Sequence, residues 1–267
     1  MEFQPYAPAR CEDGGPCEGL GRLCKGGLEP SEIGSGPSGV GVFADVAGEF
    51  REAVEILERG ATLADTIPAG EFTIYGEHPS TVCRGYGGLV KSLMGFPESG
   101  ARLVNASVAY ARHQNNAHSL AWTLGNAADV SHKRHEPATT VRFASEAIGL
   151  ACEHRMPQWL ALGERYRDWA THALGDFDGG LNLLLRGVRR WRETGAALHT
   201  TNCEICLVDS YLLQGETAAA GSHLDAARAH CRSYGEKYPA AEMDRLEALL
   251  LRCTGADQAR RDGKTRR

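Results

Sequence analysis

Residues 175–187 read Gly-Asp-Phe-Asp-Gly-Gly-Leu-Asn-Leu-Leu-Leu-Arg-Gly, and this stretch decides the fold. A glycine turn ends one helix, and a second helix follows with its apolar residues at helical spacing. A turn of this kind recurs in steps of 40 residues, at Gly95, His135, Gly175, Gly215 and Gly255. The spacing predicts four helical hairpins followed by a helix end at Gly255.

Placing the four units on this 40-residue grid aligns three columns in the second helix of each hairpin. Small residues let that helix approach its partner closely, and apolar residues fill the groove between the two. Because a two-helix unit cannot bury its apolar stripe alone, the units must stack. We therefore expect an all-α, right-handed solenoid of antiparallel hairpins with a period of about 40 residues. The columns, five, nine and twelve residues after the turn, are Gly100, Thr140, Gly180 and Ala220; Val104, Ala144, Leu184 and Leu224; and Ser107, Ala147, Gly187 and Ala227.

Three segments differ in composition. Residues 1–45 are rich in Gly and Pro without periodic apolar residues, so we expect them to be disordered. Residues 46–255 form the predicted repeat domain, which adds a helix over 49–65 and another from Pro79 to about Met94. Residues 256–267 are basic, and we interpret them as a disordered, solvated tail.

The overall composition is that of a water-soluble globular protein. Of 267 residues, 42% are hydrophobic and 24% charged, and the net charge is -5, which gives no basic surface for nucleic acid. No apolar stretch approaches the roughly 20 residues that span a bilayer, and no signal peptide is recognisable. We expect a cytoplasmic protein that binds neither nucleic acid nor membrane, while the sequence leaves its oligomeric state open.

Candidate catalytic and cofactor motifs fail on their chemistry. The glycine-rich residues 34–43 resemble a phosphate-binding loop, but the Lys and hydroxyl positions hold other residues whether counted from Gly34 or Gly36. A flexible linker is the better interpretation. No Gly-x-Ser-x-Gly elbow is present, and the sequence identifies no catalytic residue. We therefore expect a non-enzymatic protein without cofactor.

Metal and redox sites are also disfavoured. Cys203 and Cys206 have redox or half-site spacing, but they fall inside a predicted helix without a second pair at zinc-ribbon distance, so buried core thiols are favoured. His132 and His135 lie at a helix end, where capping of exposed carbonyls is favoured over metal binding. The nine cysteines are expected to be reduced, and the spacing of the first three matches no common zinc module: Cys11, Cys17, Cys24, Cys83, Cys152, Cys203, Cys206, Cys231 and Cys253.

A candidate surface for a protein or peptide partner comes from the first helix of each hairpin, which lines the concave face of such stacks. Polar and aromatic residues share columns there and would suit a peptide or helix. The alternative is that Tyr166 and Trp169 belong to the hairpin core, and we favour this for at least one of them. We call the set the polar strip: Asn126, Asp129, His132, Arg165, Tyr166, Trp169, His172 and Asp209.

The columns after the Gly-Asp-Phe turn resemble the second helix of tetratricopeptide repeats, although the period is nearer 40 than 34 and the first helix lacks the usual Trp-Leu-Gly-Tyr series. Across residues 48–252 the chain looks like the C-terminal repeat region of bacterial regulators that carry a predicted ATPase and a class III adenylate cyclase or DNA-binding domain. The stretches carrying this resemblance are Tyr75-Gly-Glu-His-Pro-Ser-Thr-Val, Leu93-Met-Gly-Phe-Pro-Glu-Ser, His118-Ser-Leu-Ala, Trp159-Leu, Gly163, Gly175 and Arg192-Glu-Thr-Gly-Ala.

The resemblance implies a non-catalytic scaffold that mediates protein-protein interaction in bacterial signalling or transcriptional regulation. No cyclase metal-binding carboxylate pair or ATPase motif can be matched, so those activities are not carried over. Two alternatives remain open. The chain is a detached C-terminal fragment of a cyclase- or ATPase-linked regulator, or it is a sensor that binds a small molecule in the solenoid groove.

Overall fold

The computed structural model describes residues 49–66, 78–193 and 200–264. These ranges contain ten α-helices and no strand, which confirms the all-α prediction. The expected helices at 49–65 and from Pro79 to about Met94 are present. In chain order the helices are α3 (Phe50–Ala64), α4 (Pro79–Leu93), α5 (Pro97–His113), α6 (Ala117–Lys133), α7 (Pro137–Glu153), α8 (Pro157–Ala173), α9 (Phe177–Glu193), α10 (Thr200–Gln214), α11 (Thr217–Tyr234) and α12 (Ala240–Lys264).

The turns occur twice as often as the 40-residue grid predicts. Inside the hairpins they fall at the four predicted positions, where the residue has positive φ. Additional turns join one hairpin to the next, and two of them use the non-glycine residues Asn115 and Arg155, with φ of 50° and 54°. A non-glycine residue in this conformation is uncommon, so no glycine marks these turns in the sequence. The prolines that open α4, α5, α7 and α8 supply a pre-set φ at each helix start.

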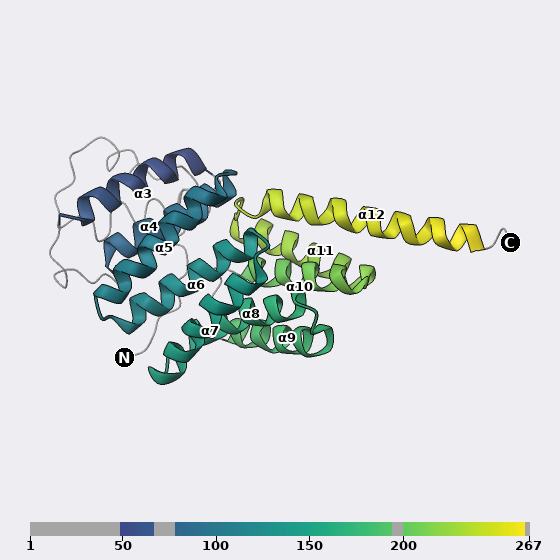
Figure 1. The fold of residues 1–267 in the computed structure, drawn as a ribbon. Helices are drawn as coiled ribbons and strands as arrows, with labels where there is room; N and C mark the ends of the chain where they lie inside the picture. Colours follow the sequence, from purple (N-terminus) through teal and green to yellow (C-terminus); the bar gives the residue numbers. More distant parts are fainter. Residues whose placement is uncertain (1–48, 67–77, 194–199, 265–267) are drawn as a thin grey trace.

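The helices form two layers (Figure 1). We call α4, α6, α8, α10 and α12 the first helices and α5, α7, α9 and α11 the second helices. Each first helix from α4 to α10 contacts its own second helix and also the next first helix along the chain. This arrangement is a helical-repeat solenoid, as predicted.

All twelve predicted column positions are buried. The small residues are required where the two helices of a hairpin touch. A Cβ added to Gly100 in α5 would lie 2.5 Å from the carbonyl oxygen of Gly88 in α4, and a Cβ added to Gly180 would lie 2.7 Å from the backbone nitrogen of His172. The interpretation of the columns as hairpin contacts is confirmed.

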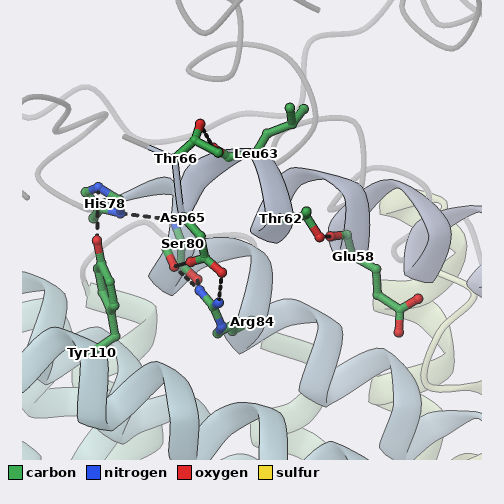
Figure 2. Close-up of polar contacts among 9 residues, drawn as sticks. All are labelled: Glu58, Thr62, Leu63, Asp65, Thr66, His78, Ser80, Arg84 and Tyr110. Carbon is green, nitrogen blue, oxygen red and sulfur yellow. Dashed lines mark hydrogen bonds and ion pairs between the residues drawn. The ribbon is translucent and has the colours of Figure 1, made fainter. Parts of the chain in front are cut away.

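A polar cluster attaches α3 to the first hairpin (Figure 2). The Asp65 carboxylate, just after α3, accepts a hydrogen bond from the Ser80 hydroxyl at 3.1 Å and forms an ion pair with Arg84 at 2.5 Å. His78 caps α4 by accepting from the Ser80 amide at 3.1 Å, and its other ring nitrogen lies 3.4 Å from the Tyr110 hydroxyl of α5. The Nδ1 atom of His78 carries no proton because it accepts from the Ser80 amide, and burial of the ring lowers the pKa of His78.

The predicted helix end at Gly255 is wrong. Helix α12 runs from Ala240 to Lys264, and Gly255 lies inside it without positive φ. Glycine ends a helix only where the chain turns left-handed, and the Ala, Gln and Arg residues that follow favour helix. The helix therefore continues through residues 256–264, which were expected to belong to a disordered tail. Residues 1–45, also expected to be disordered, lie outside the described ranges.

No helix in the described ranges is long and apolar enough to cross a membrane.

Candidate functional site

The polar strip is brought together as one cluster, but it lies inside the protein. Its residues come from three consecutive first helices, α6, α8 and α10. None is more than 9% exposed, and Arg165, Tyr166 and His172 are completely buried. Tyr166 and Trp169 both lie in the core, which confirms the alternative for these two residues. A direct role of the strip in contacting a partner stays a prediction.

Trp169 is the central contact of the strip. Its indole nitrogen donates a hydrogen bond to the Asp209 carboxylate of α10 at 2.8 Å. On the other side, the His132 ring of α6 meets it edge-on, with ring centroids 4.2 Å apart. Arg245 of α12 lies 3.7 Å from the same carboxylate. Trp169 of α8 thus contacts both α6 and α10. The Asp209 carboxylate that accepts its hydrogen bond also lies near Arg245 of α12.

His132 is a core residue and not the helix cap that its position suggested. Burial lowers its pKa to about 3, and the nearby Lys133 acts in the same direction. Its Nε2 lies 3.9 Å from the Cys206 sulfur of α10, so α6 and α10 approach each other across α8. The ring is neutral at ordinary pH, as its apolar and aromatic surroundings require.

Arg165 brings a positive charge into this interior. Its guanidinium stacks over the Tyr166 ring at 4.2 Å and lies 5.9 Å from the Trp191 ring centroid. It also donates to the Cys203 sulfur at 3.3 Å. Such cation–π contacts partly offset the cost of removing the charge from water. Arg165 therefore ties α8 to both α9 and α10.

His172 lies near the C-terminal end of α8 and contacts both α9 and α10. One ring nitrogen lies 3.2 Å from the Phe177 carbonyl at the start of α9. The other lies 3.0 Å from the Ser210 carbonyl in α10. Only a ring nitrogen that carries a hydrogen donates to its carbonyl oxygen, and the ring lies in contact with both the α8–α9 turn and α10.

Two α6 members of the strip, Asn126 and Asp129, make contacts within their own helix. The Asn126 amide donates to the Trp122 carbonyl at 3.1 Å, and Asp129 pairs with Lys133 one helical turn later. Lys133 is 20% exposed and Asp129 only 4%, so the ion pair reaches the surface through the lysine. The strip consequently presents little of its own charge to solvent.

The thiols near the strip do not form a reactive site. Cys203 and Cys206 are completely buried, as predicted, and burial raises the pKa of both. A thiol is nucleophilic as its thiolate, which such burial disfavours. The described cysteines, from Cys83 onward, are all free. Cys11, Cys17, Cys24 and the glycine-rich residues 34–43 lie outside the described ranges.

A second polar cluster lies where α10 begins. The Thr201 hydroxyl donates to Glu236 at 2.5 Å and lies 3.0 Å from a ring nitrogen of His230. Thr201 is completely buried, so no substrate can reach its oxygen. Among the described side chains, no group of three or more His, Cys, Asp and Glu residues is arranged to hold a metal ion.

Exposed apolar side chains lie outside the polar strip, at turns where the sequence did not indicate a binding surface. Leu174, Phe177 and Leu213 are 60%, 47% and 50% exposed, and we call these three residues the α8–α10 edge. The Gln214 amide donates to the Phe177 carbonyl at 3.0 Å, which places the end of α10 beside the start of α9. The available signal was large apolar residues within two positions of the turn glycines Gly175 and Gly215, where polar residues are usual.

Comparison with solved structures finds the same fold in several repeat proteins. A Rap protein complexed with competence and sporulation factor superposes with a TM-score of 0.64 at 10% identity, covering 91% of this chain and 68% of that one. The putative kinesin light chain TPR-like repeats of Podosopora anserina give a TM-score of 0.51 at 16% identity, covering 78% and 98%. BtubC of P. vanneervenii gives 0.53 at 14%, covering 81% and 87%.

These similarities establish a tetratricopeptide-like fold. The sequence matches no family model and no curated protein. The comparisons lend no support to the expected association with an ATPase or adenylate cyclase, which stays a prediction.

Proposed function

We propose that this protein is a non-catalytic helical-repeat scaffold that binds a protein partner in bacterial signalling or transcriptional regulation. The observation that carries the proposal is the α8–α10 edge. Three of the six exposed large apolar side chains among the described residues gather there. Exposed apolar groups of this kind are typical of interaction sites.

The chemistry of the edge suggests the kind of partner. Asp176 and Glu216 lie in the two adjoining turns, and both are exposed. An apolar patch beside two carboxylates suits a segment with apolar side chains flanked by Lys or Arg. The partner is therefore proposed to be a peptide or helix with apolar anchors and a basic flank.

The polar strip supports this surface from beneath. The Phe177 ring packs edge-on against His172, with centroids 5.2 Å apart, and His172 also contacts the Ser210 carbonyl. A surface held in place before binding loses less conformational entropy on association. We propose that the strip serves binding indirectly, by holding the edge in a fixed geometry. The Rap complex supports a binding role, since a protein of similar fold is complexed with a factor.

Affinity capture tests the proposal. The wild-type protein is used as bait, a recovered partner is identified and purified, and its dissociation constant is measured by calorimetry. Changing Leu174 and Leu213 together to Glu should weaken binding at least ~30-fold, because each apolar anchor contributes on the order of 1–2 kcal/mol.

Phe96→Glu is the matched control. Phe96 is 58% exposed at the corresponding turn of the first hairpin, outside the α8–α10 edge. This variant should bind within about twofold of wild type, because single rim changes cost little. Equal affinities for the Leu174/Leu213 double variant and the wild type would refute the proposed surface.

A further inference from the structure

Within the described residues, every first helix from α4 to α10 is followed by a second helix, and α12 is not. In the hairpins before α12, the second helix covers one face of the first helix. On the 40-residue grid, Ala248 of α12 corresponds to Gly88, Ala128, Asp168 and Val208, all of which are buried. A Cβ added to Gly88 would lie 2.6 Å from Val104 of α5, which identifies the second helix as the cover.

Helix α12 keeps this face but has no second helix after it in the described ranges. Ala248 is exposed, and so is Ala241, whose equivalents Thr81, Ala121, Ala161 and Thr201 are at most 1% exposed. Leu251, one turn beyond Ala248, is 65% exposed, the largest value among the large apolar side chains described. In Figure 1, α12 continues past the end of α11. Helix α12 thus has the small and apolar residues of a hairpin contact, but no described second helix packs against them.

The opposite end of the solenoid is different. The outward residues of α3 are charged, since Arg51, Glu55, Glu58 and Arg59 are all exposed. A polar outer face is what a terminal repeat needs in order to stay soluble and unpaired. Helix α3 thus exposes charged side chains, whereas the exposed positions of α12 include the small residues Ala241 and Ala248 and the apolar Leu251.

The charges on the open face of α12 are arranged symmetrically. Asp244 and Arg252 lie four residues before and four residues after Ala248, or about one helical turn on each side. Both are exposed. The Asp244 carboxylate lies 3.7 Å from Arg228, which forms a shorter ion pair of 2.7 Å with Glu247. Two such helices crossing antiparallel at Ala248 would place each Asp244 beside the Arg252 of the other copy.

We propose that α12 is the dimerisation helix of this protein and pairs antiparallel with α12 of a second copy about Ala248. The small side chains at Ala241 and Ala248 allow close approach, and Leu251 supplies buried apolar area at each end. The interface is isologous, because the same face is used by both copies, so it closes at two chains. It lies apart from the α8–α10 edge and does not depend on the proposed function.

Sedimentation equilibrium on the full chain tests this inference. The wild type should have twice its chain mass of 28.8 kDa at micromolar concentration. Ala248→Glu should sediment as a monomer, while Ala226→Glu, the same change at an exposed position of α11, should remain dimeric. Circular dichroism verifies that both variants keep their helix content, which is expected because both positions are on the surface.

Charge reversal tests the antiparallel geometry. Asp244→Arg alone, or Arg252→Asp alone, should weaken the dimer about tenfold, since each places like charges together at two symmetric contacts. The double reversal should return the dissociation constant to within about threefold of wild type. A monomeric wild type, an unaffected Ala248→Glu variant, or a double reversal without recovery would overturn the proposal. If the wild type is a monomer that binds a different protein, and Ala248→Glu abolishes that binding, the face belongs to that protein and the dimer proposal is wrong.

Discussion

Contacts inside the first hairpin and contacts between the third and fourth hairpins differ in their chemistry. Inside the first hairpin, Gly88 meets Gly100 and Val104, so the two backbones approach through small and apolar groups. Between hairpins, Trp169 donates to Asp209 and Arg165 to Cys203, so buried polar groups carry the contact. Apolar contacts are non-directional, whereas buried hydrogen bonds need defined partners. The contacts inside the hairpins thus provide most of the close apolar packing. The polar strip determines the orientation of one hairpin relative to the next.

The hairpin contacts are the more sensitive to added volume. Gly100→Val should lower the free energy of unfolding by about 3 kcal/mol, because its Cβ meets the Gly88 carbonyl oxygen at 2.5 Å and backbone atoms cannot move aside locally. Denaturant unfolding measures this. Gly149→Ala is the control, since a Cβ there meets nothing within 4 Å, and it should gain up to about 1 kcal/mol from helix propensity. A loss below 1 kcal/mol for Gly100→Val would contradict the close contact.

The strip should respond to pH through His132. Its folded pKa of about 3 lies below the ordinary value of 6.5, so the unfolded chain takes up the proton first as pH falls. The contribution of this site is fully present above about pH 6.5 and is lost progressively from there toward pH 3. When the pH falls from 7.5 to 5, the unfolding free energy of the wild type should decrease by about 2 kcal/mol through this site. The His132→Asn variant should not show this decrease. Parallel pH profiles of the unfolding free energy would disprove the buried neutral ring.

The bond between Trp169 and Asp209 should show a smaller, specific coupling. A double-mutant cycle with Trp169→Phe and Asp209→Ala should give an interaction energy of about 1.5 kcal/mol, typical of a buried hydrogen bond to a charged group. Each single variant costs more, because volume or charge also changes. Additive effects of the two substitutions would mean that the 2.8 Å contact contributes nothing to stability.

The α8–α10 edge should contribute least to stability, because it belongs to neither kind of contact. Leu174→Ser and Leu213→Ser should each change the free energy of unfolding by less than about 0.5 kcal/mol, as expected for side chains half or more exposed. Thermal denaturation of the isolated protein is sufficient to measure this. A loss of 2 kcal/mol or more would place these leucines in the core and remove the argument that they await a partner.

The hairpin architecture was predictable because its signal is local and repeated. Glycine turns and small residues such as Gly100 and Gly180 recur at the same offsets, so four units confirm one another. The turn at Arg155 was not predictable, because arginine does not mark a left-handed position. Asn115 tolerates this conformation, but a single asparagine without a glycine is a weak signal. Gly255 shows the converse error, since the glycine is present and the turn is not.

The polar strip was grouped correctly, but its burial could not be inferred. Asn126, Trp169 and Asp209 share a helical face by spacing alone, and spacing does not reveal how tightly the solenoid curls. His132 of α6 reaches Cys206 of α10, 74 residues away, only because the first helices close over α8. The α8–α10 edge was missed because turns were expected to be polar.

The sequence by itself determined that this protein is a stack of helical hairpins, because helix spacing, turn residues and close helix contacts all repeat over a short distance along the chain. Only the tertiary structure decided which polar residues are buried and which apolar residues are exposed. Burial depends on the curvature of the whole stack and on where the stack ends. That is why the strip lies inside, while Leu174, Leu213 and the open face of α12 lie outside.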